Sequence, residues 1–236
     1  MGPPVDLILE LASEFSIVNF VETGTYEGNT AVWASEHFQK VLTIEFSEHF
    51  YRETFDKYTD RENIEFIFGD SRKQLEKIIG KLEKPAIFWL DAHWSGGATY
   101  GDDDQCPLIE ELKIIGQSQF DNFIFIDDAR LFTSPPPPPH RPEQWSNIAE
   151  IIGAIHADRS DEYIVIIEDV IIAVPNFAKK IVADYCQNVN AKLWDEYGRR
   201  QNESDLKKGI VLVSNSLISK VKKPARKIYN LKGKGR

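Results

Sequence analysis

The sequence is poor in cysteine and lacks long apolar runs. Its 236 residues include only two cysteines, Cys106 and Cys186, which lie far apart and show no pairing pattern. This usage suits a reducing compartment better than a disulfide-stabilised fold. No basic-then-apolar leader opens the chain, and no apolar stretch is long enough to span a bilayer. We therefore predict a cytoplasmic protein without a membrane span.

Positive charge is also scarce. The chain has 28 Lys and Arg against 37 Asp and Glu, a net charge of -9, so its field would repel phosphates and we expect no nucleic-acid partner. The exception is the segment from Lys220 to Arg236, which is rich in Lys, Arg and Gly. A disordered, solvated tail is the simplest interpretation, and an arm that contacts lipid or RNA is the alternative.

The hydrophobic content of 42% is enough for one α/β domain with a full core. Apolar runs and helical spacings alternate along the chain, which is typical of a doubly wound sheet. The predicted strands are 17–21, 41–46, 64–68, 85–90, 122–126, 163–167 and 170–174, with a further strand near 209–214. The predicted helices are 5–15, 30–38, 47–58, 74–82, 107–115, 143–155 and 177–186.

A glycine turn follows the first predicted strand. The apolar run 17–21 leads into Glu22, and the chain then turns through Gly24 and Gly28 into a helix that starts near Asn29. A strand–glycine turn–helix unit brings bare backbone close to a ligand at the carboxyl edge of a sheet. The turn lacks the Lys and Ser/Thr of a P-loop, and bulky residues between its glycines do not fit the dinucleotide spacing.

This acidic strand end followed by Gly-x-x-x-Gly resembles the first motif of class I S-adenosylmethionine-dependent methyltransferases. The resemblance implies a Rossmann-like, doubly wound and mostly parallel seven-stranded sheet with an antiparallel edge strand, and it implies S-adenosylmethionine as cofactor. On this basis we divide the chain into an N-terminal helix (1–16), a cofactor-binding methyltransferase domain (17–175), a C-terminal extension (176–218) and a basic tail (219–236). The implied cofactor-binding residues are Glu22, Gly24, Thr25, Tyr26, Gly28, Glu45, Asp70 and Ser71.

Two of these residues also have plainer interpretations. Glu45 ends the second strand, where a carboxylate beside the first turn can accept hydrogen bonds from both ribose hydroxyls, and the alternative is a surface glutamate. Asp70 follows the third strand, where the family commonly has an acid facing the adenine amino group. Alternatively, Asp70 or Ser71 caps the helix that follows.

Three acids follow two neighbouring strands. Asp91 ends the fourth strand, and Asp127 and Asp128 end the fifth. Carboxylates crowded at one edge are costly unless a cation lies among them, and hard oxygen ligands suit Mg²⁺, Mn²⁺ or Ca²⁺. The alternative is that they are solvated strand ends or helix caps.

The strand-Asp, helix, strand-Asp-Asp pattern is similar to the metal-dependent sugar O-methyltransferases of the macrocin type. This resemblance implies that Asp91, Asp127 and Asp128 bind the metal. The residue two past the first ligand serves as general base in some relatives, and here it is His93 where a carboxylate is often found. Neutral imidazole is a competent base near pH 7, although His93 could instead bind the metal or be a core histidine.

The resulting hypothesis is methyl transfer from S-adenosylmethionine to a hydroxyl of a small molecule, a sugar or glycosylated metabolite, assisted by Mg²⁺ and with Asp91 and His93 at the reacting oxygen. Loop 94–105 is expected to close over the site, and the proline run 135–139 to shape a substrate cleft. The competing hypotheses are a metal-independent methyltransferase and a non-catalytic interaction module. A homo-oligomer is compatible with the sequence.

Overall fold

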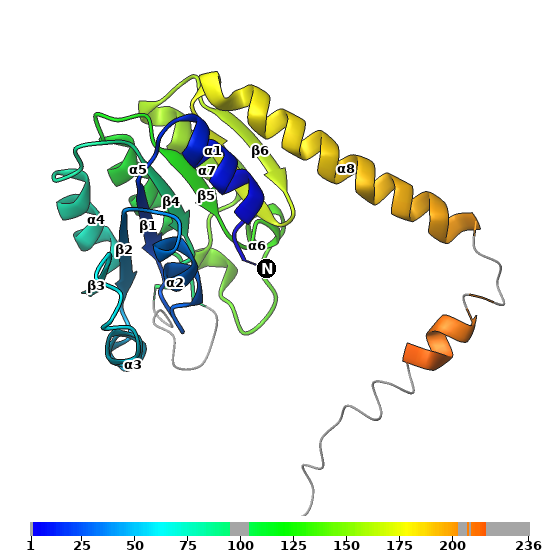
Figure 1. Ribbon diagram of the computed structural model, residues 1–236, viewed down its shortest axis with the longest axis horizontal. Helices are drawn as coiled ribbons and strands as arrows, with labels where there is room; N and C mark the ends of the chain where they lie inside the picture. The colour runs from blue at the N-terminus through cyan, green and yellow to red at the C-terminus, as the bar shows by residue number, and fades with distance from the viewer. Residues whose placement is uncertain (1, 95–103, 203–206, 208, 216–236) are drawn as a thin grey trace, which may run out of the picture. The chain divides into compact units, whose positions relative to one another are not determined.

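The computed structural model describes residues 2–94, 104–202, 207 and 209–215 (Figure 1). Within them, the chain from the N-terminus to Cys186 forms one compact unit, and a second unit begins at Gln187. The basic tail and the middle of loop 94–105 lie outside the described residues. No helix among the described residues is long and apolar enough to cross a membrane.

A seven-stranded sheet forms the centre of the first unit, in the order β3-β2-β1-β4-β5-β7-β6. The first five strands are parallel, and β7 is antiparallel to both β5 and β6. This arrangement confirms the predicted doubly wound, mostly parallel sheet with an antiparallel edge. The strands are β1 (Asn19–Thr23), β2 (Lys40–Glu45), β3 (Ile64–Phe68), β4 (Ala86–Leu90), β5 (Phe123–Ile126), β6 (Tyr163–Ile167) and β7 (Val170–Val174).

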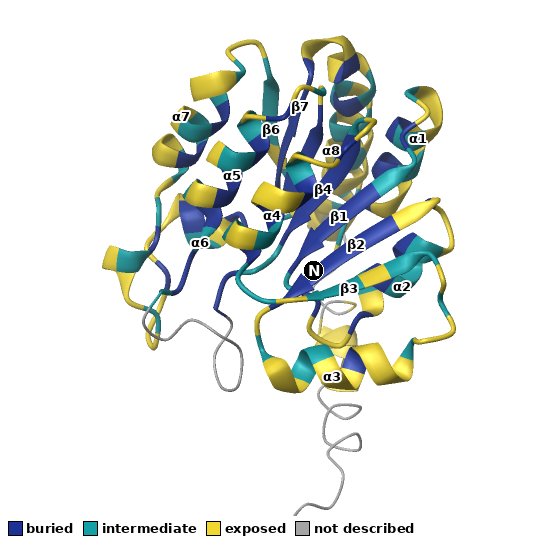
Figure 2. Ribbon diagram, turned by 90° about the vertical axis from the view of Figure 1, so that its left-hand side faces the viewer, coloured by how far each residue is buried: buried dark blue, intermediate teal, exposed yellow. Residues whose placement is uncertain are grey.

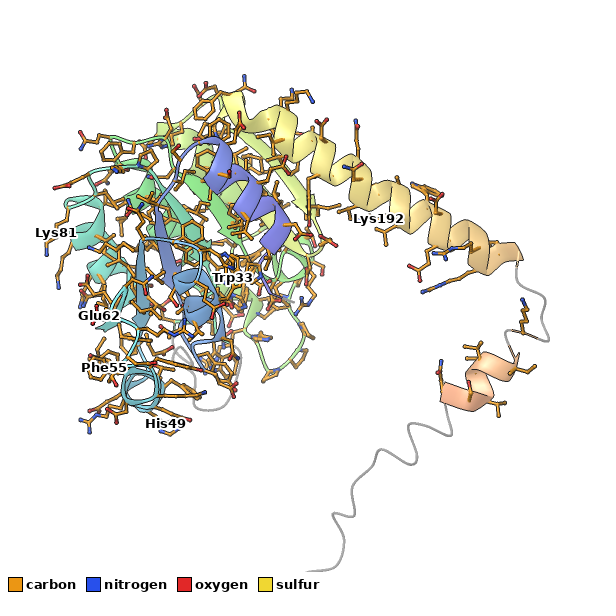
Figure 3. The ribbon with its side chains drawn as sticks, viewed as in Figure 1. Trp33, His49, Phe55, Glu62, Lys81 and Lys192 are labelled. Carbon is orange, nitrogen blue, oxygen red and sulfur yellow. The ribbon has the colours of Figure 1, made fainter. Side chains whose placement is uncertain are left out.

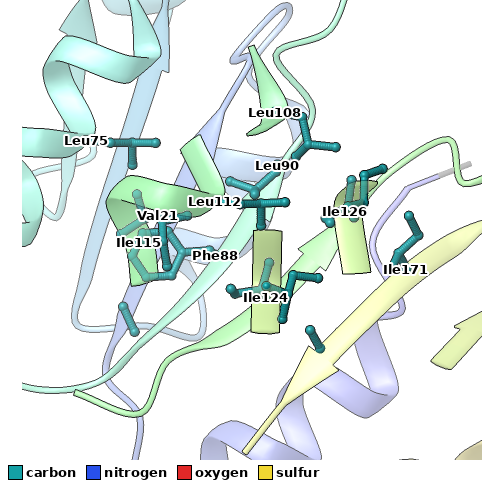
Figure 4. Packing of buried hydrophobic residues seen from close by; sticks show 14 of the residues in the cluster. Val21, Leu75, Phe88, Leu90, Leu108, Leu112, Ile115, Ile124, Ile126 and Ile171 are labelled. Atoms are coloured by element: carbon teal, nitrogen blue, oxygen red, sulfur yellow. The ribbon is translucent and has the colours of Figure 1, made fainter. Parts of the chain in front are cut away.

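Helices cover both faces of the sheet (Figure 2). On one face α4, α5 and α7 bury their apolar sides, as Leu75, Leu112 and Ile115 do against Val21 and Phe88 (Figure 4). On the other face α1, α2 and the start of α8 pack on a second cluster. The helices are α1 (Val5–Glu14), α2 (Asn29–Ser35), α3 (Glu48–Lys57), α4 (Ser71–Ile79), α5 (Leu108–Gly116), α6 (Arg130–Thr133), α7 (Ile148–Asp158) and α8 (Lys179–Asn202).

The parallel strands explain the position of the site. In this sheet β1, β2, β3, β4 and β5 run in the same direction, so their carboxyl ends meet at one edge. β1 and β4 are neighbours at the point where the strand order reverses, and in doubly wound sheets ligands bind outside the carboxyl edge at such a point. The acids predicted as cofactor and metal ligands follow these strand ends.

The predicted strand at 209–214 is wrong, because these residues are helical. Its β-branched run suggested a strand, but a strand needs a neighbour for its backbone hydrogen bonds, whereas a helix satisfies them locally. The helix predicted at 143–155 is also shorter at its start. It begins at Ile148 after a capping box in which Asn147 and Glu150 bond each other's backbone N–H groups, and a 3₁₀ turn (Pro142–Gln144) precedes it.

Candidate active site

The glycine turn lies tightly on its neighbours. Gly24, with a φ of 87°, donates its N–H to the Ile44 carbonyl at 2.9 Å. A Cβ on Gly24 would lie 2.2 Å from the Asp91 carbonyl oxygen. Tyr26 and Gly28 also have positive φ values, 47° and 77°. Gly24 is therefore required by the close approach of the turn to the end of β4.

Glu45 is held at the edge of the sheet beside this turn. One carboxylate oxygen accepts the Tyr26 N–H at 2.9 Å and the other accepts the Ser47 N–H at 2.7 Å. The side chain is largely buried, so two backbone donors fix its orientation. Each oxygen keeps a further lone pair, and the carboxylate can accept hydrogen bonds from two ligand hydroxyls.

Glu22 lies beneath the turn, inside the protein. Its carboxyl accepts a hydrogen bond from the Thr43 hydroxyl at 2.5 Å, and Thr43 in turn lies 2.6 Å from the Thr25 hydroxyl. Burial raises the pKa of Glu22 to about 8, against the lowering effect of the Thr43 hydrogen bond. Glu22 is thus joined to the turn through two threonines, one of which is the predicted cofactor residue Thr25.

The helix cap predicted for Asp70 is present. Asp70 accepts the Arg72 N–H at 3.0 Å and also pairs with the Arg72 guanidinium, whose other end binds Asp104 at 2.7 Å. Burial opposes ionisation, but the bonds to Arg72 outweigh it and lower the pKa of Asp70. Ser71 is buried at the first position of α4. The adenine-binding role of Asp70 stays a prediction.

His93 bridges two of the predicted metal ligands. Its Nε2 lies 2.9 Å from an Asp128 carboxylate oxygen, and its Nδ1 lies 3.6 Å from an Asp91 carboxylate oxygen. Burial lowers the pKa of His93, but the Asp128 hydrogen bond and the Asp91 charge outweigh it, so the pKa is raised. Burial, together with Asp127 and Asp128, raises the pKa of Asp91 to about 7. The three side chains form an Asp91–His93–Asp128 row in which His93 hydrogen-bonds to Asp128 and lies close to the charge of Asp91.

The remaining acid, Asp127, forms a hydrogen bond with the backbone of the next residue. Its carboxylate accepts the Asp128 N–H at 2.8 Å, and burial raises its pKa. Asp128 also pairs with Arg130 at 2.7 Å, and Arg130 in turn binds Asp169. Across the described part of the chain, no group of three His, Cys, Asp or Glu side chains is arranged to hold a metal ion. In this arrangement both carboxylate oxygens of Asp128 are already paired, one with His93 and the other with Arg130.

Behind His93, aromatic rings and a buried glutamine join the two loops of the predicted substrate cleft. His93 packs edge-on against Trp145, with ring centroids 5.5 Å apart. The buried Gln105 side chain accepts hydrogen bonds from the Trp145 indole N–H at 2.9 Å and from the Arg141 N–H at 2.8 Å. It therefore ties the end of loop 94–105 to the segment after the proline run. Gly96, Gly97 and Gly101, which we expect to let this loop move, lie outside the described residues.

The sequence did not point to Glu111 of α5, which is 1% exposed and buried beside the end of β1. It carries no motif, and its neighbour Glu110 is an ordinary exposed helix residue. The one available signal was its place on the apolar side of α5, where a charged residue is out of pattern with Leu108, Leu112 and Ile115.

No protein-family model matches this chain, and no curated protein sequence matches it. A solved structure from Klebsiella pneumoniae, provisionally named an O-methyltransferase, is 15% identical and aligns over 74% of this chain and 81% of its own, with a TM-score of 0.51. The O-methyltransferase TomG from Streptomyces achromogenes, solved with SAM, is 16% identical over 74% of this chain and 81% of its own, with a TM-score of 0.48. The Klebsiella likeness shows the fold, a Rossmann-like methyltransferase fold.

Proposed function

We propose that this chain is an S-adenosylmethionine-dependent O-methyltransferase that acts on a hydroxyl of a small molecule. The observation that carries the proposal is Glu45, whose two carboxylate oxygens are fixed by Tyr26 and Ser47 beside the glycine turn. In a doubly wound sheet, a carboxylate at this position suits the two hydroxyls of a ribose. The Klebsiella structure, which shares the fold, is provisionally named for the same reaction.

The residues at the edge fit such a cofactor. Glu45 offers acceptors for hydroxyl groups, and the orphaned Thr23 hydroxyl and Glu111 carboxylate oxygen lie buried beside the turn without a hydrogen-bond partner among the described residues. When bound, the cofactor supplies a methyl group that leaves a sulfonium as a neutral thioether. The turn and Glu45 would hold the cofactor, with Glu22 and Ser71 supporting it from below.

The Asp91–His93–Asp128 row would take the proton of the acceptor hydroxyl. Asp91 is the more exposed end of the row, whereas His93 is buried behind it. With its Nε2–H donated to Asp128, His93 presents its Nδ1 toward the Asp91 carboxylate at 3.6 Å. A proton that enters at Asp91 is then held at the His93 ring, and Asp128 stabilises the resulting positive charge.

A metal-independent form of this reaction is favoured by one observation. The Arg130 guanidinium lies 2.7 Å from Asp128, where it supplies the positive charge that a cation would otherwise bring. Magnesium binding by Asp91, Asp127 and Asp128 stays a prediction from the sequence. Turnover that is unchanged in EDTA would exclude it, and turnover that is lost in EDTA and restored by Mg²⁺ would support it.

The cofactor proposal is tested by calorimetric titration of the protein with S-adenosylmethionine. We expect micromolar binding by the wild type and at least about tenfold weaker binding by Glu45→Gln, because an amide offers one acceptor where the carboxylate offers two. Glu62→Gln is the matched control, since Glu62 (labelled in Figure 3) is exposed and comes before the start of β3, whereas Glu45 is the last residue of the parallel strand β2. No binding by the wild type, or equal loss in both variants, would contradict the proposal.

The sugar or glycosylated acceptor is the finer part of the proposal. It is supported by the sequence pattern of Asp91, Asp127 and Asp128 alone. Incubation of the protein with S-adenosylmethionine and a panel of sugars and glycosylated compounds, followed by mass spectrometry, would detect an added methyl group. A product that disappears in Asp91→Asn while cofactor affinity is kept would support the assigned role of the row.

A further inference from the structure

Glu111 is a buried carboxyl whose hydrogen bonding is incomplete. It lies on the sheet-facing side of α5 and is 1% exposed. The hydroxyls of Ser71 and Thr23 interact with it, yet neither Glu111 Oε1 nor Thr23 Oγ1 completes a hydrogen bond within the described residues. Buried polar atoms in folded proteins are nearly always paired, so these two point to a missing partner.

The position of Glu111 connects it to the predicted cofactor edge. Thr23 is the last residue of β1, directly before the Gly24 turn, and Ser71 directly follows Asp70. Glu111 also lines a cavity of about 10 Å³, room for about one water molecule, whose wall includes His93 and Phe132. Its carboxyl therefore lies beside Thr23, the residue before the turn, and Glu111 shares a small cavity with His93.

The groups around Glu111 favour its ionised form, whereas its burial opposes ionisation. Arg72 of α4 and His93 after β4 favour its ionised form, while the Cys106 thiol before α5 is held neutral by burial. Burial prevails and raises the pKa of Glu111 to about 7. A further positive charge placed at this edge would favour the carboxylate.

We propose, resting on the function proposed above, that Glu111 is the buried counter-charge that favours the cationic sulfonium cofactor over its neutral thioether product. The carboxylic acid would release its proton to solvent when the sulfonium compound binds. It would take a proton back once the methyl group has left and the positive charge is gone. Glu111 is thus a selectivity residue, acting on cofactor exchange rather than on the acceptor hydroxyl.

The test compares the affinities of S-adenosylmethionine and S-adenosylhomocysteine, which differ by the methyl group and its positive charge. We expect the wild type to prefer the methylated compound about fivefold to tenfold more at pH 8 than at pH 6, a change of the size that one titrating carboxyl supplies. Glu111→Gln should lower this preference at pH 8 and make it depend less on pH than in the wild type, where Glu22 and Asp91 also titrate. Glu110→Gln is the matched control, because Glu110 is the exposed neighbour on the same helix and should behave as the wild type.

A second measurement uses the wild type alone, so the inference stays testable if Glu111→Gln does not fold. Calorimetry near pH 7 in buffers of different ionisation enthalpy should show more protons released by the sulfonium compound than by the thioether. Equal release, or a preference that Glu111→Gln leaves unchanged, would overturn the role of Glu111 while the proposed function stands. If the wild type binds neither compound, the proposed function fails with it. Glu111→Asp, which keeps the charge, should keep the preference.

Discussion

The buried carboxyl of Glu22 makes a quantitative prediction for stability. Its pKa is raised from 4.5 to about 8 in the folded protein, with burial as the largest cause. Between these values the folded state keeps a proton that the unfolded state releases, so the free energy of unfolding falls as the pH rises. Each pH unit in this window costs up to about 1.4 kcal/mol, which bounds the total at about 5 kcal/mol.

Replacing Glu22 with glutamine removes this ionisation and keeps the shape of the side chain. The amide oxygen can still accept the hydrogen bond that Thr43 donates. We expect Glu22→Gln to match the wild type near pH 5, where the glutamate is neutral when folded, and to be more stable by several kcal/mol at pH 8. The other groups that titrate are common to both proteins, so the difference isolates Glu22.

Urea-induced unfolding at pH 5, 6.5 and 8, followed by tryptophan fluorescence and circular dichroism, measures the effect. Glu10→Gln is the control, because Glu10 is exposed on α1 and should leave the pH dependence unchanged. Parallel stability curves for the wild type and Glu22→Gln would refute the reasoning. They would mean that hydroxyls around Glu22 stabilise its charge as well as water does.

Three further predictions follow from local contacts and charges. Gly24→Ala should destabilise the protein by more than about 2 kcal/mol, because the new Cβ would lie 2.2 Å from the Asp91 carbonyl oxygen. Gly153→Ala is the control and should be neutral or stabilising by up to about 1 kcal/mol, because nothing lies within 4 Å of its new Cβ. Thermal unfolding compares the two variants. Asn147→Ala should cost about 1 kcal/mol in urea unfolding, since it removes the side chain that caps α7, and Glu150→Ala should cost less because only the return bond of the capping box is lost. Addition of EDTA should leave cofactor affinity unchanged in calorimetry, because the described cofactor residues contact no predicted metal ligand through a side chain; a large loss of affinity would mean that a metal orders the edge.

The order of elements was accessible from the sequence because the strands coincide with short runs of apolar and β-branched residues. The runs at Ile64–Phe68, Tyr163–Ile167 and Val170–Val174 were predicted to the residue. The cap at Asp70 was one of two interpretations and is present, since a capping bond reaches only two residues along the chain. Contacts between residues close in the chain depend little on how distant elements pack, so the sequence predicts them well.

Contacts between distant elements were not accessible in the same way. The approach of His93 to Asp128 joins residues 35 apart, and it depends on where the loops after β4 and β5 settle. The pairing of Arg130 with Asp128 was not predicted. Arg130 also pairs with Asp169, which lies 39 residues further along the chain in the turn before β7. The helix predicted to end near Cys186 continues as α8 to Asn202, and most of its described residues after Cys186 are exposed.

Two buried acids lie at the end of β1, one on each face of the sheet: Glu22 belongs to β1 itself and Glu111 to α5. Side chains alternate along a strand, so Glu22 points to the face of α1 and α2, whereas Thr23 points to the face of α4 and α5 and meets Glu111 there. The two acids differ in one respect: Glu22 has the Thr43 hydroxyl as a donor, while Glu111 Oε1 lacks a partner among the described residues. If both were structural, Glu22→Gln and Glu111→Gln would change stability alone. A cationic ligand at the turn predicts instead that the Glu111 substitution changes the choice between charged and neutral ligand, because a buried acid with one oxygen unpartnered gains from a nearby positive charge.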